Sequence, residues 1–99
     1  MTIKLINRGN EGELLLEGRL DTTTSEDAYE IFQQTAQKFD TLILNFNKLE
    51  YVSSAGLRSL KRLYIIMQQK GGQLILRSVS PYVMEILEMT GFSALFKIE

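Results

Sequence analysis

Two adjacent serines, Ser53 and Ser54, are the residues of this chain best placed to do chemistry. They open a run of small residues, Ser53-Ser54-Ala55-Gly56, that separates a mainly apolar stretch from a longer amphipathic one. If these stretches are a strand and a helix, the serines stand where unpaired backbone N–H groups and the positive end of the helix dipole favour anions. A serine hydroxyl at such a junction can cap the helix, bind an anion or receive a phosphate.

A capping role alone would make either serine worth about 1 kcal/mol of stability. Gly56 favours a further role, because glycine in the first turn gives up about 1 kcal/mol of helix propensity relative to alanine. No local turn requires this glycine, so we expect another molecule to approach closely here. A phosphate on the hydroxyl would meet the N–H groups of the helix start and add negative charge to a recognition surface. The pattern therefore predicts a charge switch.

The residues that are absent exclude most catalytic chemistry. The chain has no histidine and no cysteine, which removes Ser-His-Asp catalysis, a thiolate nucleophile and imidazole or thiolate metal ligands. None of the glycine-rich phosphate-binding motifs occurs. Catalysis that uses only Asp, Glu, Lys or Ser is still open. We expect a protein that is not an enzyme and that holds no metal or cofactor.

Composition restricts the fold and the partners. The chain has 99 residues, 44% of them apolar, which is enough for one small domain spanning residues 1–99. Eleven basic and twelve acidic residues give a net charge of -1, which argues against nucleic-acid binding. No apolar run approaches the roughly 20 residues of a membrane span, and the start lacks a signal peptide. We expect a cytoplasmic protein that does not insert into a membrane.

The elements that position the serines follow from hydrophobic periodicity and turn residues. Strands are expected at residues 2–7, 13–20, 41–46, 73–77 and 95–98. Helices are expected from the Asp21–Ser25 segment to Phe39, from the serines to Lys70, and from Ser80-Pro81 to Gly91. Residues 47–51 are expected to lead from the third strand to the serines.

The order β-β-α-β-α-β-α-β predicts a small α/β domain with a mixed sheet and three helices. The first strand is antiparallel and the others are largely parallel, because strand–helix–strand units make right-handed parallel crossovers. The nearly continuous apolar run at 41–46 indicates a central strand covered on both faces. Gly18, inside the second strand, indicates a bulge or a close approach.

The segment Tyr51-Val52-Ser53-Ser54-Ala55-Gly56-Leu57-Arg58 resembles the signature of STAS domains, the fold of bacterial anti-sigma factor antagonists. The resemblance extends over essentially the whole chain. Three further segments resemble landmarks of the family, and they occur in the same order as in the family. One precedes the first helix, Gly18-Arg19-Leu20-Asp21, and two come after the serines, Lys70-Gly71-Gly72-Gln73-Leu74 and the segment from Gly91 to Ile98.

The resemblance implies a phosphorylation-controlled partner switch. In the family, an anti-sigma factor with serine kinase activity phosphorylates one serine and releases the antagonist, and a serine phosphatase restores it. Matching Gly56-Leu57 to the family's Gly-Leu places the phosphate on Ser54, with Ser53 as the second choice. The partner kinase would use the ATP, so no cofactor is implied for this chain.

The resemblance also implies that the Asp21 loop lies beside the phosphorylation site and contributes to partner binding. We expect the basic residues of the following helix to meet an acidic patch on the partner. The expected partner-binding residues are Asp21, Thr22, Ser53, Ser54, Gly56, Arg58, Lys61 and Arg62. The sequence itself leaves simpler roles open: Asp21 could only help to cap the first helix, and the three basic residues could be a solvated helix face.

The sequence departs from the family pattern at three places, and two other functions are open. Ser53 stands where the family often has Asp, Asn45 stands where a strand-end Asp is frequent, and the sequence stops at Glu99, where many members continue into a last helix. The first rival function is a constitutive STAS interaction subunit of an ABC lipid-transport complex or of another regulatory complex. The second is an enzyme or nucleotide-binding protein that uses Asp21, Ser54 and the helix dipole.

Overall fold

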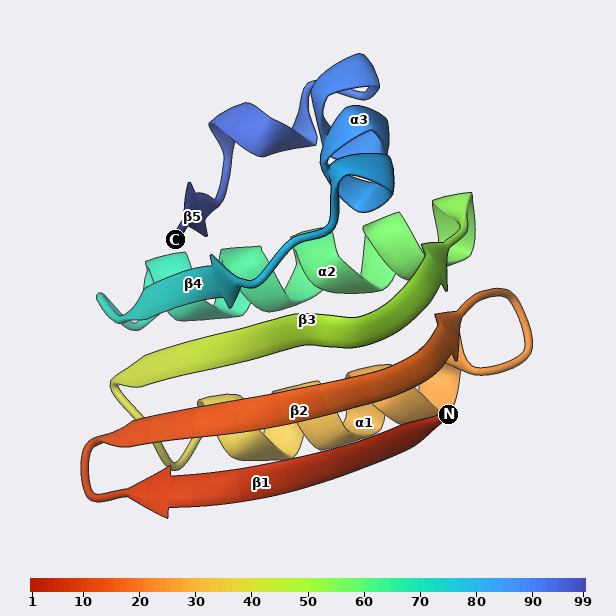
Figure 1. The fold of residues 1–99 in the computed structure, drawn as a ribbon. Coiled ribbons are helices and arrows are strands. Elements are labelled where there is room, and N and C mark those ends of the chain that lie inside the picture. Colours follow the sequence, from red (N-terminus) through yellow and green to blue (C-terminus); the bar gives the residue numbers. More distant parts are fainter.

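The computed structural model describes all residues 1–99 and contains one five-stranded sheet with three helices (Figure 1). The elements in order are β1 (Thr2–Arg8), β2 (Glu11–Leu20), α1 (Ser25–Ala36), β3 (Thr41–Val52), α2 (Ser54–Gln69), β4 (Gln73–Arg77), α3 (Pro81–Met89), the 3-10 helix η1 (Phe92–Ala94) and β5 (Lys97–Ile98). The strands lie side by side in chain order. Strand β1 is antiparallel to β2, and every other neighbouring pair is parallel. The predicted fold class is confirmed.

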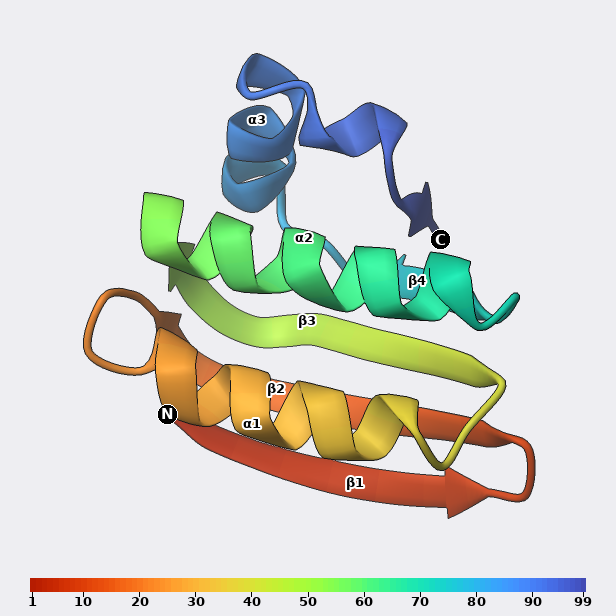
Figure 2. The ribbon, with the colours of Figure 1, turned by 180° about the vertical axis from the view of Figure 1, so that it is seen from behind.

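Helices α1 and α2 cover the same face of this sheet (Figure 2). Because the strands follow one another in one direction, crossovers of the same hand carry both connecting helices to the same side. The main core lies between the sheet and the three helices and contains 20 buried residues, among them Phe46 of β3, Phe32 of α1 and Leu87 of α3. Packing in this core holds α1 and α2 against the sheet and so sets the positions of their N-termini.

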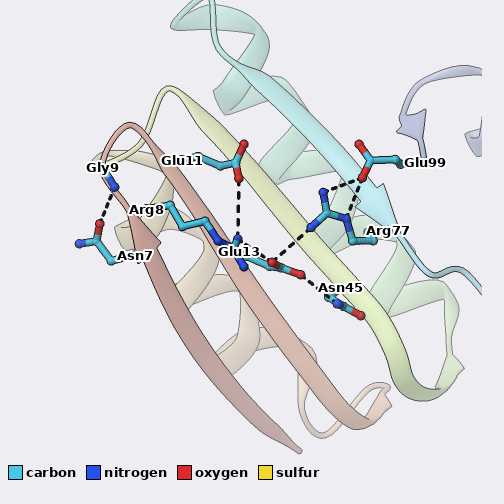
Figure 3. Close-up of polar contacts among 8 residues, drawn as sticks. All are labelled: Asn7, Arg8, Gly9, Glu11, Glu13, Asn45, Arg77 and Glu99. Carbon is cyan, nitrogen blue, oxygen red and sulfur yellow. Dashed lines mark hydrogen bonds and ion pairs between the residues drawn. The ribbon is translucent and has the colours of Figure 1, made fainter.

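The opposite face of the sheet carries no helix, yet β3 is buried on that face as well, so the expectation of a strand covered on both faces is confirmed. Ile43 and Ile75 are only 1% and 6% exposed there, outside the main core cluster. The side chains around them form a polar network across the strands (Figure 3). Charged side chains with long apolar stems can cover aliphatic surface in this way.

Glu13 of β2 is the centre of that network, and its side chain is 4% exposed. Its carboxylate accepts hydrogen bonds from Arg8 Nη1 at 2.7 Å, Asn45 Nδ2 at 2.9 Å and Arg77 Nη1 at 3.3 Å. Arg77 also donates to Glu99 Oε1. Burial acts to raise the pKa of Glu13, but the hydrogen bonds from Asn45 and Arg8 and the charges of Arg77 and Arg8 outweigh it and lower that pKa.

We expect Glu13→Gln to lower the free energy of unfolding by about 2 kcal/mol at pH 7, because the arginines lose a charged acceptor. Because the pKa of Glu13 is lower in the folded state than in the unfolded state, the charged carboxylate stabilises the fold at pH values above the unfolded-state pKa, near 4.5. This stabilisation is lost as the pH falls through the folded-state pKa. The difference between wild type and variant in urea denaturation should therefore shrink below pH 4.5. Glu17→Gln, at an exposed position of the same strand, is the control. An equal difference at pH 7 and pH 3 would contradict this role of the charge.

Several element boundaries differ from the prediction: α1 ends at Ala36 and not at Phe39, and β2 begins at Glu11. Residues 47–51 continue β3 to Val52 instead of leaving the sheet, and the last strand is reduced to Lys97–Ile98 by the 3-10 turn before it. The β2–β3 pairing shifts register between Leu15 and Glu17 and again between Gly18 and Arg19. The irregularity predicted at Gly18 is confirmed. These shifts interrupt the alternation of apolar and polar residues along β3, which is why the sequence pattern ended the strand early.

Candidate functional site

The two serines lie where β3 passes directly into α2. Ser53 has an extended backbone and is the N-cap of α2, and its Oγ accepts a hydrogen bond from the Gly56 N–H at 3.1 Å. Ser54 is the first residue of the helix, is exposed, and makes no side-chain hydrogen bond within the chain. The backbone N–H of Ser53 donates to the Leu20 carbonyl at 2.9 Å, which ties the junction to the end of β2. One serine is thus occupied as a cap, and the other presents a free hydroxyl.

We expect this difference to appear in stability. Ser53→Ala should lower the free energy of unfolding by about 1 kcal/mol, because the Gly56 N–H loses its acceptor. Ser54→Ala should change it by less than about 0.5 kcal/mol, the usual range for an exposed position. Urea denaturation of the matched pair measures both, and equal losses would show that Ser54 has a structural role.

The explanation of Gly56 from the sequence was wrong. Gly56 is buried, and a Cβ atom at this position would lie 2.5 Å from the Leu20 carbonyl oxygen and 3.1 Å from Val52 Cγ1. The close approach that requires glycine is therefore made by the protein's own β2 and not by another molecule. Gly56 positions the start of α2 against the end of β2, and it offers no exposed side chain for a partner.

Asp21 organises the loop between β2 and α1, which lies beside this junction. Its Oδ1 accepts hydrogen bonds from the Thr23 N–H at 3.0 Å, the Thr23 hydroxyl at 2.8 Å and the Thr24 N–H at 3.2 Å. The hydrogen bond from the Thr23 hydroxyl is the main cause that holds the pKa of Asp21 below its ordinary value, against the opposing effect of burial. The carboxylate is thus held within its own loop, just before the first residue of α1.

A shallow groove of about 230 Å³ lies between the first turns of α1 and α2. It is lined by Thr22, Ser25, Glu26, Ala55, Arg58, Ser59 and Arg62. Thr22, Arg58 and Arg62 are thus brought together at this groove. Ser54 does not line it but directly precedes Ala55, which does, and Lys61 is exposed on α2 outside it. Helix packing explains this arrangement, because α1 and α2 lie side by side on one face of the sheet (Figure 2).

The basic residues of α2 differ in how firmly they are held. Arg62 lies with its Cζ 3.7 Å from the centre of the Tyr29 ring and its Nη1 3.7 Å from Glu26 Oε1. Arg58 and Lys61 are exposed and make no ion pair. The positions of Ser25 and Glu26 at the groove and of Tyr29 against Arg62 were not expected, since the sequence contains no signal for the contact between two helices. Of the two cations without an ion pair, Arg58 lines the groove and Lys61 lies outside it on α2.

The structure contains no group of three or more Asp, Glu, His or Cys side chains that could hold a metal ion. None of its helices combines the length and the apolar character that a bilayer crossing needs. The site itself offers an exposed hydroxyl at a helix start, with a hydrogen-bonded loop beside it and Arg58 one turn further along α2.

Comparison with known sequences identifies a family profile and two relatives. The family profile described as STAS domain matches residues 4–99. A protein of Bordetella bronchiseptica, provisionally named anti-sigma factor antagonist BtrV, is 30% identical over 84 residues, which cover 84% of this chain and 72% of the relative. The anti-sigma F factor antagonist of Paenibacillus polymyxa is 29% identical over 102 residues, which cover 99% of this chain and 85% of the relative.

Solved structures share the fold. The Bacillus cell fate determinant SpoIIAA in its phosphorylated form superposes with a TM-score of 0.77 at 19% identity, covering 99% of this chain and 91% of that one. The unphosphorylated form of SpoIIAA gives a TM-score of 0.78 at 18% identity, covering 99% of this chain and 87% of that one. At these identities the likeness shows the fold alone. Both sequence relatives carry the name anti-sigma factor antagonist. Because the family profile matches nearly the whole chain, this protein belongs to the STAS domain family.

Proposed function

We propose that this protein is an anti-sigma factor antagonist that works as a serine-phosphorylation-controlled partner switch. In the unphosphorylated state it binds an anti-sigma factor with serine kinase activity through the start of α2, the Asp21–Thr24 loop and the groove between them. The observation that carries the proposal is the unequal use of the two serines. Ser53 is occupied as the helix cap, and Ser54 presents an exposed hydroxyl with no partner in the chain.

Phosphorylation of Ser54 would act by charge and not by unfolding. The phosphate adds roughly -1.5 to -2 charges at pH 7, and the first turn of a helix is a favourable place for an anion. The fold therefore tolerates the modification. Binding to the partner does not tolerate it. The partner's surface closes on an uncharged hydroxyl, and with phosphate present it would have to desolvate an anion or place that anion beside its own charges. A serine phosphatase removes the phosphate and restores binding.

The other parts of the site have defined tasks in this proposal. Asp21 keeps the loop in one shape, and Thr22 presents an exposed hydroxyl at the groove. Arg58 and Lys61, which make no ion pair, suit an acidic patch on the partner, whereas Arg62 is held by Tyr29 and Glu26. The protein itself carries out no catalysis, binds no nucleic acid and needs no cofactor, since the partner uses the ATP. A cytoplasmic location follows from these partners.

The proposal is tested by mapping phosphate after capture of the partner. Wild-type protein is incubated with native cell lysate and ATP, bound proteins are identified by mass spectrometry, and phosphopeptides of the protein itself are sequenced. We expect a kinase-type partner and a single phosphate on Ser54, which Ser54→Ala abolishes and Ser53→Ala does not. Capture of a transporter ATPase with no phosphate on either serine would instead identify a constitutive subunit and refute the switch.

A further inference from the structure

The free edge of the sheet at β1 has an unusual concentration of exposed apolar side chains. Seven large apolar side chains of the protein are exposed, and four of them belong to the β1–α1 edge: Met1 at 41%, Leu5 at 46%, Ile6 at 36% and Ile31 at 38%. Strand β1 pairs only with β2, and nothing lies beyond it in the sheet (Figure 1). A long unpaired edge with apolar side chains is a template for another strand.

The charges on β1 exclude two of the ways in which a second copy can pair with it. We consider antiparallel pairing about a two-fold axis perpendicular to the sheet, which keeps the helices of both copies on the same side. The only charged side chains of the strand are Lys4 and Arg8. An axis through Lys4 places this lysine opposite its own copy, and an axis through Ile6 places it opposite Arg8. Like charges directly opposite each other destabilise a strand pair.

An axis through Leu5 avoids both conflicts. Lys4 then lies opposite Ile6 of the second copy, and Arg8 lies opposite Thr2. Leu5 is also the midpoint of β1, which runs from Thr2 to Arg8, so all seven residues of each strand find a partner. The most exposed apolar side chain of the strand meets its own copy at the centre of the pair.

The surroundings of β1 fit this arrangement. Helix α1 lies along β1 on the covered face of the sheet (Figure 2), and a shallow groove of about 160 Å³ between them is lined in part by Met1, Ile3, Ala28 and Ile31. A neighbouring strand would lie about 4.8 Å from β1. The C-terminal end of β1 from the second copy would then cover the groove beside the N-terminal end of β1 in the first copy. Apolar surface of Ile31 would thereby be removed from water.

We infer that this protein forms a homodimer in which the two β1 strands pair antiparallel about Leu5, making one continuous ten-stranded sheet. A seven-residue strand pair with its flanking side chains buries an area at the low end of stable interfaces, of order 1,000 Å². The dimer is therefore concentration-dependent. Helix α2, with Ser54, lies on the other side of α1 from this edge, so the dimer displays two separate copies of the serine site.

Cysteine cross-linking tests this register directly, because the chain has no cysteine of its own. Directly opposite residues of antiparallel strands have Cα atoms about 4.5–5.5 Å apart, within the range of a disulfide. Full-length Leu5→Cys at about 100 μM under mild oxidation should form a disulfide dimer at least ten times faster than Ile65→Cys. Ile65 is the matched control, since it is 42% exposed on α2. Equal rates for the two variants would overturn the inference.

Light scattering after size exclusion, over about 1 μM to 1 mM protein, tests the association itself. Wild type should move from monomer to dimer mass with concentration. Leu5→Lys, which brings two cations together on the axis, should stay monomeric, while Ile65→Lys should associate as wild type does. Circular dichroism verifies that the variants are folded. A wild-type monomer at every concentration would overturn the inference and leave Lys4 and Arg8 as charges that guard the edge. A Leu5→Lys dimer would overturn it as well.

Discussion

Ser54→Asp is expected to weaken binding of the captured anti-sigma partner by about 100-fold or more. The aspartate places a permanent negative charge at the first position of α2, where the partner is proposed to close on an uncharged hydroxyl. A charge that is poorly matched across a closed interface costs several kcal/mol, and about 3 kcal/mol corresponds to this loss of affinity. Titration calorimetry with the purified partner measures the effect.

The loss cannot be attributed to unfolding, because an acidic residue in the first turn of a helix is favourable by a few tenths of a kcal/mol. Ser54→Asn is the matched control, since it has the size of aspartate without the charge, and we expect it to keep most of the affinity. Ser54→Ala should bind as wild type does and should not be released when ATP is added. If the Asn and Asp variants lose binding equally, shape and not charge controls the interface.

Gly56→Ala is expected to lower the free energy of unfolding by about 2 kcal/mol, although alanine is the better helix former by about 1 kcal/mol. The added methyl group would lie 2.5 Å from the Leu20 carbonyl oxygen, which also accepts the hydrogen bond from the Ser53 N–H. The start of α2 must then move away from the end of β2. For a chain of this size the loss corresponds to a fall in the melting temperature of roughly 10 °C.

Gly71→Ala separates this steric effect from the effect of backbone conformation. Gly71 has a φ of +75°, but a Cβ there would meet no atom within 4 Å, so we expect a loss of only about 1 kcal/mol. Thermal unfolding of both variants provides the comparison. A Gly56→Ala variant as stable as wild type would mean that α2 does not begin as close to β2 as the structure has it.

The order of elements could be predicted because each carries a local signal. Alternation and apolar runs indicate the strands, and Ser80-Pro81 indicates the start of α3, where the Ser80 hydroxyl indeed accepts the Val83 N–H. The extension of β3 to Val52 could not be predicted in the same way. The register shifts in its pairing with β2 interrupt the pattern on which strand prediction depends.

The features that were missed depend on contacts between distant residues. The sequence indicated that Gly56 is needed for a close approach, but only the structure shows that the approaching atom is the Leu20 carbonyl oxygen. The apolar run of β3 correctly indicated two covered faces, but it did not show that helices cover one face and that a polar network around Glu13 lies on the other. Glu13 and its partner Asn45 are 32 residues apart in the sequence. For the serines, the sequence identified the junction, and the structure distinguishes the hydroxyl that caps the helix from the one that is free.

The central claim is that the state of the Ser54 hydroxyl decides whether the partner binds. The most direct measurement compares one preparation in two states: protein phosphorylated on Ser54 by its captured kinase, and the same protein after phosphatase treatment. Each is titrated into the nucleotide-free partner in a calorimeter. The account predicts binding by the dephosphorylated protein and an affinity at least about 100-fold lower for the phosphorylated one. Equal affinity of the two states would contradict it.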